Sequence, residues 1–170
     1  MTLTYAGRGD GTCLPVVASP LLFVSEKAAV AQRIVPMIAY EDGLAAVEFL
    51  TRAFGFTEDE GERYMNGDGT VGHAELVFGG DRIMLATPNT DYRGPTRHRD
   101  TCDEARRWLD NPWVIDGVFV EVDDVDAHHA TALAAGAKVI RPLGDPGVGF
   151  RVYTAEDSEG HRWMFGQAAY

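Results

Sequence analysis

Three ionisable side chains, His73, Glu75 and Glu121, could move a proton or hold a charged ligand. His73 and Glu75 are two residues apart in a strand-like run, so both side chains leave the same face of a sheet. A histidine beside a carboxylate is a common acid–base pair for removing a proton next to a carbonyl group. The two carboxylates would also pair with cationic groups of a bound molecule. The residue types therefore leave proton transfer and ligand binding both open.

These side chains fall in a plan that occurs twice along the chain. Asp42 and Asp124, 82 positions apart, each stand where a helix N-cap is expected, and Gly80 and Gly160, 80 positions apart, each precede a closing strand. A repeat of this kind predicts an α+β fold of two strand–helix–strand–strand–strand modules. The predicted elements are strands at 34–40, 57–66, 71–78 and 82–86 with a helix at 43–54, and strands at 118–122, 138–141, 150–154 and 161–166 with a helix at 124–135.

Two segments fall outside the repeat. Residues 1–31 are expected to form an N-terminal arm, with an extended segment or a short helix at 25–32, ahead of a first module at 32–88. Residues 89–115 are expected to form a connector ahead of a second module at 116–170. In the connector, the charged run 97–100 indicates a loop, and 102–110 a short helix that carries Trp108. A connector of this length either wraps the body or borders a site.

Composition narrows the classes of function. The net charge is −11, from 26 acidic and 15 basic residues, which argues against nucleic acid and anionic membrane as partners. It suits a neutral or cationic ligand. Cys13 and Cys102 show no paired spacing, which favours free thiols and a cytoplasmic location. No apolar run reaches membrane-spanning length, and we expect no secretion signal.

Strand alternation sorts the side chains of both modules onto two faces. The valines of 118–122 are expected to meet the helices, which leaves methionines, aromatic rings and ionisable groups on the other face. Such a mixture is typical of a pocket wall, because methionine adapts to bulky ligands. The alternative is an ordinary second face on which His73 and Glu75 partner each other. The residues predicted for this face are Met37, His73, Glu75, Met84, Phe119, Glu121, Tyr153 and Met164.

Two stretches carry the signature of a known superfamily. These are VDDVDAHHATALAAGA at 122–137 and AEDSEGHRWMF at 155–165, the latter similar to an Asp-Pro-Glu-Gly-His-x-Trp ending with Ser158 in place of proline. Over residues 33–167 the chain resembles the vicinal oxygen chelate superfamily, also called the glyoxalase/bleomycin-resistance/dioxygenase fold. The resemblance implies two βαβββ modules in a cupped mixed sheet with helices on the outer face. It also implies a homodimer, in some members with modules exchanged between chains.

The resemblance further implies where family enzymes hold a divalent metal such as Zn, Ni or Fe. Carried over one by one, the four ligand positions are Val35, Met84, Gly117 and Met164. None supplies the nitrogen or carboxylate oxygen that these metals need, and a one-residue shift adds only Asp116. We therefore expect no metal at the family site. A metal on His73, Glu75 and Glu121 is the alternative.

The remaining histidines are expected to be structural. His128 and His129 are adjacent on a predicted helix and point about 100° apart, so they cannot both face one ion. We expect His129 to pack and His128 to lie at the wet surface. His161 precedes the last strand, and we expect it to bond to nearby backbone.

Three hypotheses of function follow. The leading one is a metal-independent small-molecule-binding protein of the bleomycin-resistance type, which sequesters an antibiotic or a similar bulky ligand. The alternative is a glyoxalase-like lyase or isomerase with a non-standard metal site or a His/Glu pair. Without a metal its enolate lacks several kcal/mol of stabilisation, which ranks it lower. The third is a scaffold or regulatory domain. The residues expected to stack on a planar ligand are Tyr64, Trp108, Phe119 and Tyr153.

Overall fold

The computed structural model describes residues 32–111 and 117–168 of the chain. They belong to one compact unit that spans Gln32–Tyr170. The predicted arm at 1–31, with Cys13, and the alternative ligand Asp116 lie outside the described residues.

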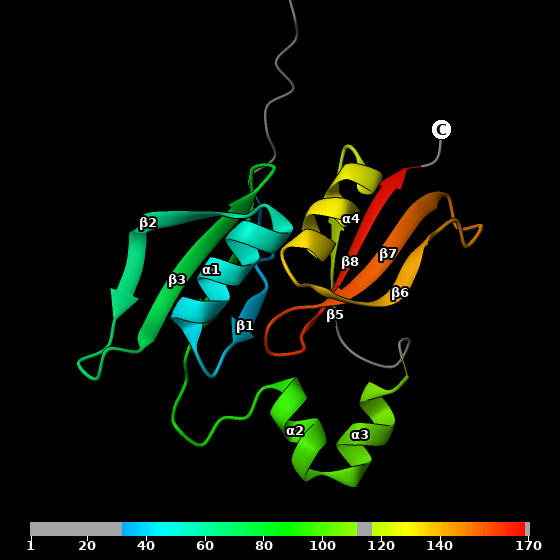
Figure 1. The fold of residues 1–170 in the computed structure, drawn as a ribbon. Helices are drawn as coiled ribbons and strands as arrows, with labels where there is room; N and C mark the ends of the chain where they lie inside the picture. Colours follow the sequence, from blue (N-terminus) through cyan, green and yellow to red (C-terminus); the bar gives the residue numbers. More distant parts are fainter. Residues whose placement is uncertain (1–31, 112–116, 169–170) are drawn as a thin grey trace, which may run out of the picture. The chain divides into compact units, whose positions relative to one another are not determined.

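The α+β fold of two βαβββ modules is confirmed (Figure 1). The described strands form two separate four-stranded sheets, ordered β1-β4-β3-β2 and β5-β8-β7-β6. In each sheet the first and last strands of the module pair in parallel and the other pairs are antiparallel. The first module comprises β1 (Met37–Ala39), α1 (Gly43–Phe54), β2 (Thr57–Met65), β3 (Val71–Phe78) and β4 (Asp81–Ala86). The second comprises β5 (Gly117–Glu121), α4 (Val125–Ala134), β6 (Lys138–Gly144), β7 (Phe150–Glu156) and β8 (Arg162–Ala168).

Local sequence signals set both long helices. The Asp42 carboxylate accepts a hydrogen bond from the Ala45 amide at 3.0 Å, which satisfies a free donor at the start of α1. Gly55 follows the helix with φ 74°, a left-handed conformation that favours glycine. Asp124 caps α4 in the same way through the Ala127 amide at 2.9 Å. Both predicted helices and their N-caps are therefore confirmed.

The two modules contact each other through the sides that carry the helices. Helices α1 and α4 lie against each other. At the end of α1, the Phe54 ring packs 5.7 Å from Trp163 and 4.8 Å from Phe165, both on β8 of the second module. All three side chains are fully buried. Aromatic pairs of this kind add about 0.5–1.5 kcal/mol each beyond the area that they bury.

The turn between β7 and β8 makes a second, polar connection between the modules. Asp157 accepts hydrogen bonds from the Tyr40 hydroxyl at 2.7 Å and from the Trp163 indole at 3.0 Å. Glu159 accepts from the amides of Glu41 at 2.8 Å and Asp42 at 2.9 Å, at the N-terminus of α1. A carboxylate is stabilised at this end of a helix by the free amides and the helix dipole.

The connector contains two short helices, α2 (Pro95–Thr101) and α3 (Asp103–Leu109). The predicted helix at 102–110 is confirmed as α3, whereas the predicted loop over 97–100 is wrong. Pro95 stands in the first turn of α2, where its missing amide leaves no bond unmade. Arg99 of α2 forms an ion pair with buried Glu156 at 3.2 Å, which holds the connector against the second sheet.

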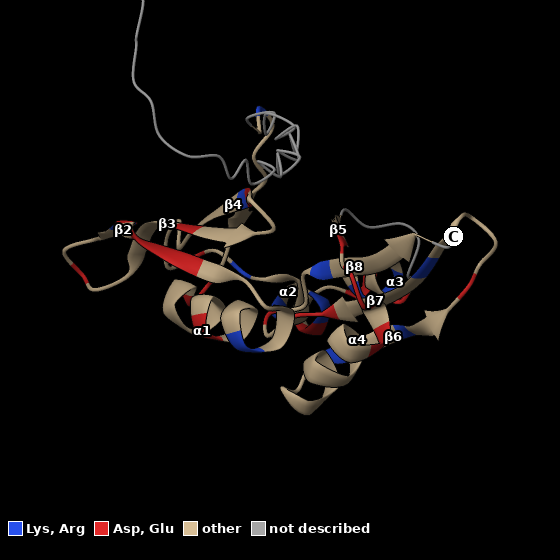
Figure 2. Ribbon diagram, turned by 90° about the horizontal axis from the view of Figure 1, so that it is seen from above, with Lys and Arg blue, Asp and Glu red and all other residues tan. Residues whose placement is uncertain are grey.

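The strand β2 forms the outer edge of the first sheet and is strongly acidic (Figure 2). Its side chains are mostly exposed. Charges on an edge strand discourage pairing with other chains. The acidity of β2 therefore has a structural explanation that needs no ligand.

Candidate functional site

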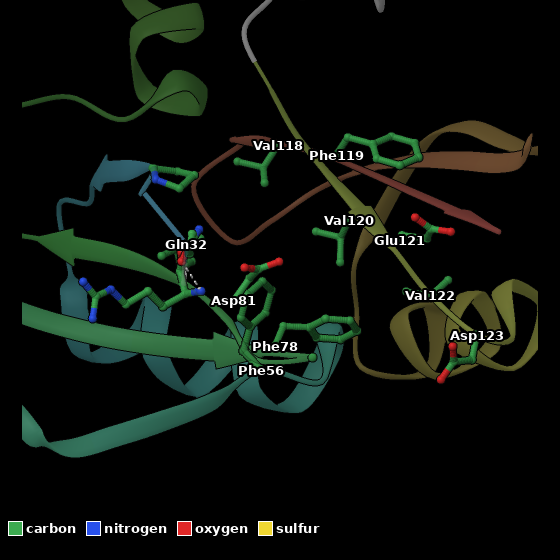
Figure 3. Close-up of a pocket in the computed structure, with 14 residues that line it drawn as sticks. Gln32, Phe56, Phe78, Asp81, Val118, Phe119, Val120, Glu121, Val122 and Asp123 are labelled. Atoms are coloured by element: carbon green, nitrogen blue, oxygen red, sulfur yellow. Dashed lines mark hydrogen bonds between the residues drawn. The ribbon is translucent and has the colours of Figure 1, made fainter. Parts of the chain in front are cut away.

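A pocket of about 540 Å³ lies along β5 (Figure 3). Its apolar wall is formed by Phe56 and Phe78 of the first module and by Val118 and Val120 of the second. The rings of Phe56 and Phe78 pack against each other with centroids 5.4 Å apart. Val118 and Val120 leave β5 on the side of these rings, and Phe119 leaves it on the opposite side (Figure 3).

The rim of this pocket is acidic. Asp81, Glu121 and Asp123 line it and are exposed. Arg82 also lines it, but its guanidinium lies 3.5 Å from the carboxylate of Glu75. The backbone of Arg82 is held by the Gln32 side chain through hydrogen bonds of 2.8 and 3.0 Å. The rim therefore favours a ligand with a cationic group.

Part of the predicted face forms a separate, smaller hollow of about 200 Å³ on the first sheet. It is lined by Met37, His73 and Met84. Met37 pairs with Met84, and Met84 with Glu75, so the three side chains share one face. Met37 is 78% exposed, which leaves this apolar surface open.

His73 and Glu75 are neighbours on that face, as the sequence predicts. The His73 Nε2 lies 3.5 Å from one oxygen of Glu75, and Arg82 lies 3.5 Å from the other. Glu75 is only 8% exposed. This arrangement fits an acid–base pair of His73 and Glu75. It fits equally a structural role, in which Glu75 holds the side chains of His73 and Arg82 in place.

The predicted position of Tyr153 is wrong. Tyr153 is fully buried on the helix side, where its ring stacks on Phe165 at 5.2 Å. The turn between the last two strands is one residue longer in the second module: Glu75 pairs with Met84, but Thr154 pairs with Met164. Thr154 is therefore the counterpart of Glu75, and Val152, which pairs with Gly166, takes the position expected for Tyr153. The 80-residue offset does not extend to this strand.

The prediction that His128 lies at the wet surface is also wrong. Its Nδ1 lies 2.7 Å from the Tyr153 hydroxyl and its Nε2 lies 3.2 Å from the Phe54 carbonyl. Because a carbonyl only accepts, Nε2 carries the proton and Nδ1 accepts from Tyr153. Burial lowers the pKa of His128 and raises that of Tyr153. His128 thus links α4 to the end of α1. His129 packs against Tyr153, as predicted.

His161 lies beside Asp157 in the β7–β8 turn. Its amide donates to the Asp157 carboxylate at 3.0 Å, and its Nε2 lies 3.4 Å from the Tyr92 hydroxyl. Its ring packs 4.5 Å from Tyr40. These contacts belong to the polar connection between the modules, in agreement with a structural role.

Of the aromatic residues predicted to stack on a ligand, Phe119 lines the pocket along β5, and Trp108 and Tyr64 do not. Phe119 lies in the pocket along β5, with its ring at 80° to Phe150 and 5.4 Å away. It also covers Gly166, where an added Cβ would meet the ring at 2.7 Å. Trp108, 60% exposed, lies on α3, and Tyr64 is exposed on β2; neither lines the pocket or the hollow.

Of the residues that line this pocket, Phe119 and Glu121 were predicted from the sequence to line a ligand site, whereas Phe56, Phe78 and Asp81 were not. Phe56 follows the stop at Gly55, and Phe78 ends β3. Both look like core residues of one module, and only the packing of two modules makes them a pocket wall. The sequence signal available was their apolar character next to glycine turns.

The donor set does not fit the metal centre of family enzymes. Of the four positions that the resemblance assigns to ligands, Met84, Gly117 and Met164 lie in strands, whereas Val35 precedes β1 rather than lying in the first strand as predicted. None of the four side chains offers a nitrogen or carboxylate donor. Within residues 32–111 and 117–168, no three His, Cys, Asp or Glu side chains gather where they could hold an ion.

The fold and these motifs define a family. The model of the glyoxalase/bleomycin resistance protein/dioxygenase superfamily matches residues 33–165, and the chain belongs to this superfamily. It is 31% identical over 132 residues to the uncharacterized protein Rv0887c of Mycobacterium tuberculosis H37Rv, covering 78% of this chain and 72% of that one.

Solved structures of similar fold include members of this superfamily and an antibiotic binding protein. TioX from Micromonospora sp. ML1 is 33% identical with a TM-score of 0.56, over 82% of this chain and 98% of TioX. TnmS3, an antibiotic binding protein from Streptomyces sp. CB03234, shares the fold at 17% identity and a TM-score of 0.50, over 82% of this chain and 99% of TnmS3. In the described part of this chain, no helix is long and apolar enough to cross a membrane.

Proposed function

We propose that the protein is a metal-independent binding protein that sequesters an antibiotic or a similar bulky small molecule. The observation that carries this proposal is the pocket of about 540 Å³ along β5. Its volume lies in the range of about 300–1,000 Å³ typical of small-molecule sites. The antibiotic-binding protein TnmS3 has the same fold, which supports binding as a use of this architecture.

The residues that line the pocket would contribute to ligand binding in different ways. Phe78 and Phe119 offer aromatic surface to an apolar or planar ligand, and Phe56 packs behind Phe78. Glu121 and Asp81 at the rim pair with a cationic group. Binding by shape and charge needs no metal, which is consistent with the donor set at the family positions.

The proposal includes a homodimer and retains the cytoplasmic location predicted from the sequence. Ile34, which precedes β1, is 86% exposed, and Met37, the first residue of β1, is 78% exposed. β1 is an edge strand of the first sheet. Exposed apolar groups of this kind are typical of association surfaces. Size-exclusion chromatography with light scattering should give twice the monomer mass at micromolar concentration; a monomer there would contradict the dimer.

A thermal-shift screen of antibiotics, thiol conjugates and divalent ions tests the proposal. A ligand at about 100 times its dissociation constant should stabilise the protein by about 2.7 kcal/mol. Hits should raise the melting temperature equally with and without EDTA. If divalent ions alone stabilise the protein and no organic compound does, the proposal fails.

A second candidate is a glyoxalase-like lyase or isomerase, favoured by the 3.5 Å approach of His73 to Glu75 above the hollow on the first sheet. Turnover of methylglyoxal–thiol adducts, measured with and without added divalent ions, distinguishes it. Activity abolished in a His73→Gln variant would establish it. Turnover at the background rate would leave binding as the function.

A further inference from the structure

One edge of β5 is unpaired beside the pocket. In the order β5-β8-β7-β6, β5 pairs with β8, and no other described strand pairs with it. Side chains from both faces of β5 line the pocket: Val118 and Val120 from one face, Phe119 and Glu121 from the other. A pocket bordered by both faces of a strand lies along the edge of that strand (Figure 3).

The hydrogen bonds to β8 show which backbone groups this edge presents. The Val122 amide donates to the Gly166 carbonyl of β8 at 2.9 Å. In a parallel pair, alternate residues direct both their amide and their carbonyl to the same neighbour. Val120 therefore also faces β8, whereas Phe119 and Glu121 direct theirs to the free edge. These two residues are about 6.6 Å apart along the strand, a spacing that an extended peptide repeats.

We propose that the pocket binds an extended peptide or peptide-like molecule, which adds to β5 as a further strand. This inference rests on the proposed function and names the class of ligand. The ligand backbone bonds to the amides and carbonyls of Phe119 and Glu121. The ligand side chains on one face enter the pocket and lie against Phe78, Val118 and Val120. Main-chain bonds then supply affinity, and the aromatic wall supplies selectivity.

The rim selects a cationic member of this class. The described residues that line the pocket carry three carboxylates, those of Asp81, Glu121 and Asp123, and one guanidinium, that of Arg82. Arg82 is already 3.5 Å from the Glu75 carboxylate. A lysine or arginine side chain on the ligand, or a free amino group, complements this charge, and an acidic ligand is repelled.

The probe is a capped peptide of alternating valine and lysine, compared with two N-methylated forms by calorimetric titration. One form is methylated on its odd-numbered residues and the other on its even-numbered residues. Alternate amides of a strand point to opposite sides, so only one form loses the donors that face β5. That form should bind about tenfold more weakly or worse, and the other should bind like the parent.

Amide exchange followed by NMR locates the contact. In the free protein the amides of Phe119 and Glu121 should exchange fast, and the peptide should slow both at least about tenfold. The Val120 and Val122 amides, already bonded to β8, should not change. If Phe119 and Glu121 are instead protected without peptide, in proportion to protein concentration, a second copy occupies the edge and the inference is overturned.

A pair of variants checks the backbone contribution from the protein side. Phe119→Pro removes one edge amide, and proline is tolerated on an edge strand where that amide faces solvent. Phe119→Leu changes the side chain but keeps the amide. Phe119→Pro should bind the peptide several-fold more weakly than Phe119→Leu; equal affinities would overturn the inference.

The outcomes separate the two proposals. If both methylated peptides bind like the parent, the pocket binds ligands but not through the β5 edge, and only this inference fails. The same holds if no peptide binds while compounds from the thermal-shift screen do. If neither peptides nor any compound bind, the proposed function fails as well.

Discussion

Replacing Asp157 with asparagine should loosen the polar connection between the modules. One carboxylate oxygen accepts from Tyr40 at 2.7 Å and from Trp163 at 3.0 Å, and the other accepts from the amides of Glu159 and His161, both at 3.0 Å. An asparagine has a single acceptor oxygen, so its amide group faces two donors in either orientation. Hydrogen bonds to a charged group contribute about 1.5–3 kcal/mol each, so Asp157→Asn should destabilise the protein by about 3–5 kcal/mol.

Urea unfolding of Asp157→Asn and Tyr40→Phe measures this effect. Tyr40→Phe removes only one of the bonds and should lower the free energy of unfolding by about 1.5–3 kcal/mol. Burial alone would raise the pKa of Asp157, but the hydrogen bonds from His161, Tyr40 and Trp163 outweigh it and lower the pKa below about 3.9. The carboxylate therefore stabilises the fold fully above about pH 5, and this contribution is lost as the pH falls towards the lowered pKa.

The comparison of wild type with Asp157→Asn should accordingly show its largest difference near neutral pH and a smaller one in acid. A loss of stability below about 1 kcal/mol at pH 7 would contradict this prediction, since it would mean that the four hydrogen bonds to Asp157 contribute little. A difference that grows in acid would refute the sign of the pKa change.

Three further predictions concern the module contact and the pocket. Burial lowers the pKa of His128, so the free energy of unfolding of wild type should fall as the pH drops below about 6.5. Urea unfolding of His128→Gln should show no such dependence on pH. The same dependence in both proteins would contradict a lowered pKa for His128. Gly166→Ala should displace the Phe119 ring and weaken binding of screen hits about tenfold, whereas Gly144→Ala, with open space around it, should bind like wild type. Glu121→Gln should weaken cationic ligands by a few-fold at low salt and have little effect at about 1 M salt, as titration calorimetry would show; a loss independent of salt would exclude a charge effect.

The elements with local signals were predictable from the sequence. Asp42 and Gly55 bound α1 because a cap and a left-handed stop act within one helical turn. α2 was missed because it has no buried residue and hence no apolar periodicity. Its charged residues resemble those of a loop.

The candidate site was only partly predictable. The alternation of side chains along strands predicted Met37, His73 and Met84 on one face, because this prediction needs only the direction of each side chain within its own strand. Tyr153 was misplaced by a single extra turn residue, because a shift of one position moves a side chain to the opposite face. The pocket along β5 joins Phe56 and Phe78 to residues 118–123. That contact depends on how the modules pack, for which the sequence carries no local signal.

Calorimetric titration of the strongest screen hit into wild type and Phe78→Ala, each with and without EDTA, measures whether the pocket along β5 binds its ligand without a metal. Phe78 lines the pocket along β5 and is not one of the four positions where family enzymes hold a metal. We expect one dissociation constant for wild type in both conditions, and binding about tenfold weaker or worse in Phe78→Ala. Binding that disappears with EDTA, returns with zinc and is unaffected by Phe78→Ala would contradict it.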